Sequence, residues 1–178
     1  MKAITTLPSL VRANNDVCAE FKKLGLYTDG LHRTGVSLSF GLWDFFENGH
    51  YADNEVTIPK VSTSAAFGSY CSLRDTLRHE FGHALLDHHP ELVKGSEWRS
   101  VFGAKQHQPS PLDYYHEDFV TPYANAGSTV EEDFCESLMT WARHQGSIGR
   151  YRYSRPGVHR KLKFIATLPQ KVKALRLA

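Results

Sequence analysis

Residues 79–83 of this chain read His-Glu-Phe-Gly-His, so that His79 and His83 are four positions apart. On an α-helix, residues four apart lie one turn apart on the same face, and both imidazoles can then reach one metal ion. The pattern H-E-x-x-H is typical of zinc hydrolases in which the glutamate acts as general base. We therefore expect His79 and His83 to be metal ligands and Glu80 to be the catalytic base.

The residues around this motif have the signals of a helix. Ser72 and Asp75 form the pattern of a capping box, and Pro90 marks a point that the helix should not pass. We predict a helix from Ser72 to about Asp87 or His88. Gly82 lies in its middle, where glycine costs about 1 kcal/mol relative to alanine. That cost indicates that another segment packs closely against Gly82.

A catalytic zinc site takes three protein ligands and a water, and the sequence offers two sources for the third ligand. His89 has the metzincin spacing, but Leu86 stands where that pattern has the glycine that lets the chain turn. The other source is the acidic segment 131–136, in which Glu132 and Glu136 share one face of a predicted helix. One carboxylate would bind the metal while the other holds a ligand histidine in place. The alternative is that these are first-turn acids that interact favourably with the helix dipole.

The composition is that of one globular domain spanning residues 1–178. Hydrophobic residues make up 41% and charged residues 22% of the chain, as in ordinary soluble proteins. No stretch approaches the roughly 20 apolar residues of a membrane helix, and the N-terminal segment lacks the features of a signal peptide. The three cysteines are widely spaced and odd in number, which favours reduced thiols. We expect a cytoplasmic protein, or one exported as an effector without a cleaved signal.

The formal net charge of +2 hides an asymmetry, because residues 137–178 contain ten Lys or Arg and no Asp or Glu. Such a region can bind nucleic acid, an anionic membrane or an acidic partner. The basic residues are scattered rather than clustered, which favours a solvated helix face that also offsets the acidic segment 113–136. A non-catalytic module that binds nucleic acid through this region is the alternative function.

Two strands are predicted in the N-terminal third of the chain. Residues 36–40 alternate between apolar side chains and serine, which is typical of a half-buried strand. Residues 56–58 form a second, short strand, and Pro59 favours an edge position for it. An edge strand there would form the rim of the cleft and pair with an extended substrate.

Helices are predicted in the rest of the chain, which makes the fold class α+β. The first should begin at Asn14 or Asn15 and stop at Gly25. Residues 98–119 are expected to be irregular. A helix is expected from Ser128 or Thr129 to about residue 144, and a last basic helix over 158–167, which a proline at 169 interrupts or restarts.

Three further motifs accompany H-E-F-G-H: W-R-x-V-F-G at 98–103, F-V-x-x-Y-A at 119–124 and E-D-F-x-E at 132–136. Together the four motifs resemble a family of zinc-binding metallopeptidases of the gluzincin clan, and the catalytic domain of anthrax lethal factor. The likeness covers about residues 72–145, and H-E-x-x-H with E-D-F-x-E is far more specific than H-E-x-x-H alone. It implies a zincin-like domain with a small mixed sheet, an active-site helix, a C-terminal helical part and one zinc ion per chain.

The resemblance also implies residue roles. Glu132 would be the third zinc ligand, and Glu136, one turn later, would support a ligand histidine. A tyrosine upstream of these acids would stabilise the reacting oxyanion, a role that maps to Tyr123. Tyr123 and Glu132 are nine positions apart, a longer spacing than in the family, so Tyr114 or Tyr115 stays open for this role.

The expected function is a zinc metalloendopeptidase that acts on a protein or peptide substrate, without a nucleic-acid partner or a membrane span. An ImmA-like regulatory protease with one protein target is the alternative enzyme, because those proteases share the glycine of the motif and a downstream acidic ligand helix. An inactive scaffold that keeps zinc for stability is a further option. Residues 1–50 carry no part of the resemblance, so it gives no substrate.

Overall fold

A computed structural model describes residues 3–40, 49–62, 71–93, 95–102, 117–126 and 129–175. The strands are β1 (Ala3–Ile4), β2 (Gly35–Ser39), β3 (His50–Ala52), β4 (Glu55–Pro59) and β5 (Val61–Ser62). The first helices are α1 (Leu7–Lys23), α2 (Asp29–Arg33) and α3 (Leu73–His88), followed by the 3₁₀ turn η3 (Pro90–Val93). The later elements are α4 (Ser96–Phe102), α5 (Pro122–Ala126), α6 (Val130–Arg143), the 3₁₀ turn η5 (Gly149–Tyr151), α7 (Pro156–Ile165) and α8 (Leu168–Leu175). The fold is mixed α+β and mostly helical.

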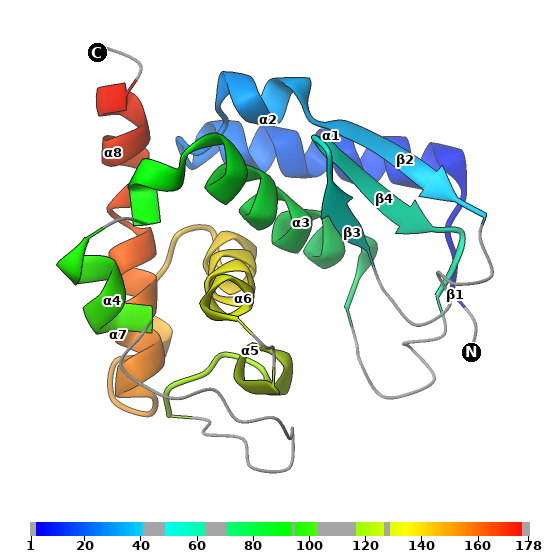
Figure 1. Cartoon of the computed structure of the whole chain (residues 1–178). Coiled ribbons are helices and arrows are strands. Elements are labelled where there is room, and N and C mark those ends of the chain that lie inside the picture. Colours follow the sequence, from blue (N-terminus) through cyan, green and yellow to red (C-terminus); the bar gives the residue numbers. More distant parts are fainter. Residues whose placement is uncertain are drawn as a thin grey trace.

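Helix α3, which contains the H-E-x-x-H motif, runs through the centre of the molecule (Figure 1). Helices α1 and α2 pack on one side of it and α6 packs on the other, while β3 and β4 contact it as well. Helix α7 packs against α6 and α4. The buried hydrophobic side chains of these elements form one continuous core. No helix within the described ranges is both long and apolar enough to cross a membrane.

Helix α1 begins well before the predicted start at Asn14 or Asn15. The side chain of Thr6 accepts a hydrogen bond from the Ser9 backbone N–H, and the Ser9 hydroxyl completes a capping box. A helix capped there continues through the two asparagines, which therefore lie inside it. Its end at Gly25 was predicted correctly, and Gly25 has a φ of +74°.

The three-stranded sheet has the order β2-β4-β3, with β2 parallel and β3 antiparallel to β4. Both predicted strands exist, but placing residues 56–58 at an edge was wrong, because β3 pairs with the other side of β4. Strand β3 was not predicted, although its turn has a signal in the sequence. Asp53 and Asn54 connect β3 to β4 with φ angles of 50° and 64°, which is the conformation of a tight hairpin turn. Pro59 stands at the end of β4, where it removes no hydrogen bond from the strand's interior.

The helices that carry the motifs follow the predictions closely. Helix α3 begins after Ser72, whose side chain accepts from the Asp75 backbone N–H, and α6 begins after Thr129. The predicted last helix corresponds to α7 and α8. The predicted irregular stretch 98–119 is partly wrong, because its start belongs to α4, while residues 103–116 lie outside the described part.

The close packing predicted at Gly82 is confirmed, and its partner is Cys135 of α6. A Cβ atom at position 82 would lie 2.9 Å from the Cys135 Sγ and 3.2 Å from its Cα. Any side chain at this position would therefore force α3 and α6 apart or displace the buried thiol.

We predict that Gly82→Ala lowers the free energy of unfolding by about 1–3 kcal/mol, the range typical of overpacking. This loss should outweigh the gain of about 1 kcal/mol in helix propensity. Chemical denaturation of the metal-free protein measures the change. Gly149→Ala is the control, because nothing lies within 4 Å of its Cβ position, and it should change stability little. Unchanged stability in Gly82→Ala would contradict a required close approach of the two helices.

Candidate metal centre

Helix α3 brings His79 and His83 together, as their spacing predicts. Their Nε2 atoms are 3.2 Å apart, and the ring centroids are 5.0 Å apart. His79 is buried and His83 is half-buried, so the two rings meet at the boundary between the core and the surface. Both Nε2 atoms could therefore bind a single metal ion located between them and helix α6.

Glu132 approaches the same position from α6. Its Oε2 is 3.1 Å from the His79 Nε2, and its Oε1 is 3.4 Å from the His83 Nε2. Three ligands at about 2.0–2.1 Å from a tetrahedral zinc ion are about 3.3–3.4 Å from one another. The two nitrogens, and each nitrogen with one oxygen of Glu132, are thus at separations close to those of zinc ligands, and the donor types are those that zinc takes. The fit is therefore good in both distance and chemistry.

Glu136 lies one turn after Glu132 and contacts the other side of His79. The His79 Nδ1 is 2.8 Å from the Glu136 Oε1. An ionised carboxylate only accepts hydrogen bonds, so Nδ1 carries the proton and Nε2 is left for the ion. The position of Glu136 agrees with the supporting role that the resemblance implies.

The two carboxylates also decide the charge of His79. Burial alone lowers its pKa, but the hydrogen bonds to Glu132 and Glu136 outweigh burial and raise the pKa to about 10. The same contacts hold the pKa of Glu132 well below its usual range, against the opposing effect of burial. Without a metal, His79 therefore carries a second proton at neutral pH, and a cation that binds there must displace it.

Glu80 is buried beside the two histidines, with a side chain only 6% exposed. Burial raises its pKa, although His79 and His83 act in the opposite direction. Within the described part of the chain, its carboxylate takes part in no hydrogen bond. The backbone of Gly49, just before β3, lies next to it, since a Cβ there would be 3.1 Å from the Glu80 Oε1. Glu80 is thus close to the two histidines of the site.

Tyr123 lies on α5, above the same histidine. Its ring centroid is 5.9 Å from that of His79, and the residue is 55% exposed. The structure thus places the Tyr123 ring beside that of His79, in spite of the longer spacing of Tyr123 from Glu132. Tyr114 and Tyr115 lie outside the described residues.

Cys135 is a potential metal ligand that was not identified from the sequence. The sequence predicts only that its thiol is reduced. Ligand atoms of His79, His83 and Cys135 all lie within 4.8 Å of one another, so this group could hold a metal ion. Burial raises the pKa of the Cys135 thiol well above its usual value, and so do the carboxylates around it, which opposes the thiolate that metals bind. Glu132 offers oxygens 3.1 and 3.4 Å from the two nitrogens, and its lowered pKa favours the ionised form that a metal binds. The position of Cys135 three residues after Glu132, on one helix face, was the signal that could have revealed it.

His89 is not part of the site. Helix α3 continues through Leu86 to His88, so the chain does not make the turn that the metzincin pattern needs. His89 follows the helix end, and its Nδ1 lies 3.1 Å from the Glu91 Oε1.

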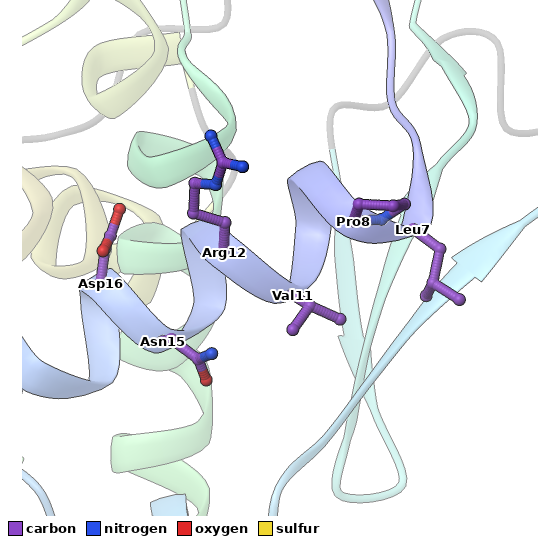
Figure 2. Close-up of a pocket in the computed structure, with 6 residues that line it drawn as sticks. All are labelled: Leu7, Pro8, Val11, Arg12, Asn15 and Asp16. Atoms are coloured by element: carbon purple, nitrogen blue, oxygen red, sulfur yellow. The ribbon is translucent and has the colours of Figure 1, made fainter.

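A shallow hollow on the first turns of α1 lies on a different part of the surface (Figure 2). Its lining residues are Leu7, Pro8, Val11, Arg12, Asn15 and Asp16. Their side chains point in different directions in Figure 2, and Asp16 forms an ion pair with Arg74 of α3. This hollow therefore lacks the converging polar groups of a catalytic or metal-binding site.

Comparisons of the chain with protein-family models, with curated proteins and with solved structures find no match. The family resemblance accordingly rests on the four motifs alone. The geometry of the site is the independent observation from which a function can be proposed.

We predict that Glu132→Ala weakens zinc binding more than about 100-fold, beyond the loss usual for residues that only support a ligand. Glu131→Ala is the matched control, because Glu131 is exposed on the same first turn of α6. Competition with a chromophoric chelator measures the dissociation constants. Cys135→Ala should bind zinc nearly as tightly as the wild type. A large loss in Cys135→Ala and none in Glu132→Ala would assign the third donor to the thiol.

Proposed function

We propose that this protein is a zinc-dependent metallopeptidase of the gluzincin type, with a zincin-like domain, that hydrolyses peptide bonds in proteins or peptides. One observation carries the proposal: two histidine Nε2 atoms and the Glu132 carboxylate lie 3.1–3.4 Å apart beside the buried Glu80. Three protein ligands with one remaining position are the arrangement of catalytic rather than structural zinc sites. His79, His83 and Glu132 would hold the ion.

When bound, zinc would lower the pKa of a water ligand toward about 7 and polarise the scissile carbonyl. Glu80 would accept the proton of the attacking water on its carboxylate and pass it to the leaving amine. Its raised pKa suits this role, since a general base works best when its pKa is near the working pH.

Tyr123 would donate its hydroxyl hydrogen to the oxyanion that develops on the attacked carbonyl. Its exposure allows the ring to approach a substrate that lies across the site, and its contact with His79 keeps it near the reacting group.

Strand β3 takes over the substrate-binding role that was predicted for residues 56–58. It is the edge strand next to β4, and Gly49 immediately before it adjoins Glu80. A substrate that binds in an extended conformation along β3 would therefore pass the general base. This arrangement supports an endopeptidase, which binds peptide on both sides of the cleaved bond.

We predict that Glu80→Gln retains one zinc per chain but loses hydrolysis by about 10²–10⁴-fold, the usual contribution of general acid–base catalysis. Elemental mass spectrometry gives the metal content, and a peptide library gives the cleavage rate. His79→Ala is the companion variant and should lose the metal as well. Full activity in Glu80→Gln would exclude the proposed mechanism, and a wild-type chain that takes up no zinc would exclude the metal site.

We predict that Tyr123→Phe lowers kcat by about 10²–10³-fold, as the removal of an oxyanion donor does elsewhere, with zinc affinity unchanged. Tyr153→Phe is the control, because Tyr153 is also exposed and its ring contacts Arg152 outside the site. Steady-state kinetics on one cleaved peptide separates kcat from KM. An unchanged kcat in Tyr123→Phe would move the oxyanion role to Tyr114 or Tyr115.

A further inference from the structure

The second oxygen of Glu136 has a partner that the motifs do not reveal. The Thr121 hydroxyl donates a 2.6 Å hydrogen bond to the Glu136 Oε2, while the Oε1 faces the His79 Nδ1 at 2.8 Å. Both oxygens of this buried carboxylate are thus held by named donors. Because a carboxylate with one free oxygen can rotate, the Thr121 bond restricts Glu136 to the orientation that holds His79.

The same hydroxyl also fixes the helix that contains Tyr123. The Thr121 Oγ1 accepts a 3.1 Å hydrogen bond from the backbone N–H of Ala124, in the first turn of α5. A hydroxyl offers one donor and two acceptor lone pairs, so Thr121 can make both bonds at once. One side chain therefore connects Glu136 on α6 to the residue after Tyr123.

The segment before Thr121 is anchored by two basic residues of the C-terminal region. Lys161 of α7 forms an ion pair with the Asp133 Oδ2 at 2.6 Å and donates to the Asp118 carbonyl at 2.5 Å. Arg155 donates to the Phe119 carbonyl. Lys161 is 3% exposed and Asp133 is fully buried, so this anchor is part of the interior. Thr121 consequently follows a backbone that is fixed to α6 and α7.

We propose that Thr121 is the positioning residue of the metal site, which orients His79 through Glu136 and holds Tyr123 over it through α5. The proposal rests on the proposed function, because it requires His79 to be a metal ligand. Nothing in H-E-x-x-H or E-D-F-x-E includes Thr121, and the two motifs supply no other donor to the Glu136 Oε2 within the described residues. Thr121 therefore connects α5 and α6, a link that the two motifs do not indicate.

Thr121→Val tests the proposal, because valine has nearly the shape of threonine but no hydroxyl. Zinc affinity should fall about tenfold, the lower end of the range for groups that orient a ligand histidine. The visible absorption of the Co²⁺-substituted protein should shift, because His79 is less firmly oriented. Thr121→Ser keeps the hydroxyl and should restore both the affinity and the spectrum. A merely structural role would not move the Co²⁺ spectrum or distinguish serine from valine in this way.

Thr140→Val is the matched control. Thr140 is a buried threonine on α6, one turn after Glu136, and its hydroxyl makes no hydrogen bond within the described part of the chain. This variant should keep wild-type zinc affinity and Co²⁺ absorption. If Thr121→Val does not fold, as judged by circular dichroism, Thr121→Ala removes the same hydroxyl and replaces it in the test.

The outcomes separate the two proposals. Wild-type zinc affinity and an unchanged Co²⁺ spectrum in Thr121→Val would overturn the role of Thr121 and leave the metal site intact. The role of Thr121 would also be overturned if serine were as damaging as valine. A wild-type chain that binds neither zinc nor Co²⁺ would overturn the metal site and the positioning role together.

Discussion

The close approach of α3 and α6 at Gly82 and Cys135 is the constraint on which the site depends. His79 and His83 belong to α3 and Glu132 to α6, so the 3.1 and 3.4 Å that separate them require the two helices to lie close together. Glycine removes the side chain that would hold the helices apart, at the cost of helix propensity. Residues four apart lie on the same face of a helix. His79 and His83 of α3 can therefore face Glu132 and Glu136 of α6 where the two helices pack together.

The packing of α6 into the core buries charged side chains. The free-energy cost of burying them is offset by ion pairs. Asp133 lies between Glu132 and Glu136 on α6, fully buried, and Lys161 reaches it from α7. Breaking such a pair by removing one partner typically costs about 3–5 kcal/mol, because the other charge is left in the interior. Part of the basic C-terminal region is therefore used inside the molecule. Lys161 and Arg155 thus have a structural role, in holding the segment before Thr121.

The sequence predicted the two helices of the site, whose starts are decided by local caps, although the equally local capping box at Thr6 and the turn at Asp53 and Asn54 were missed. Ser72 and Thr129 cap the two helices as their patterns predict, and the four-residue spacings place each pair of site residues on one helix face. Residues 56–58 were wrongly placed at an edge, because the sheet order depends on β3, which is only three residues long. Thr121 could not be predicted, since it reaches Glu136 across 15 positions through a contact that only the packing of α5 on α6 creates. The motifs identify the side chains that would bind a ligand. The side chains that orient these residues, such as Thr121, are brought to them only by the tertiary structure.

The electrostatics of the site explain why these residue types belong together. Three carboxylates, those of Glu80, Glu132 and Glu136, lie around two imidazoles, and burial makes each negative charge costly unless a positive charge is near. In the metal-free protein, protonated His79 supplies one such charge. The hydrogen bonds of its ring to Glu132 and Glu136 favour this protonated form and raise its pKa to about 10. A divalent cation between the Nε2 atoms and Glu132 would replace this proton and supply a second charge. Of the three carboxylates, Glu80 would then be the one that neither binds this cation nor orients His79 in the proposed function, and burial raises its pKa, which suits the general base of that function.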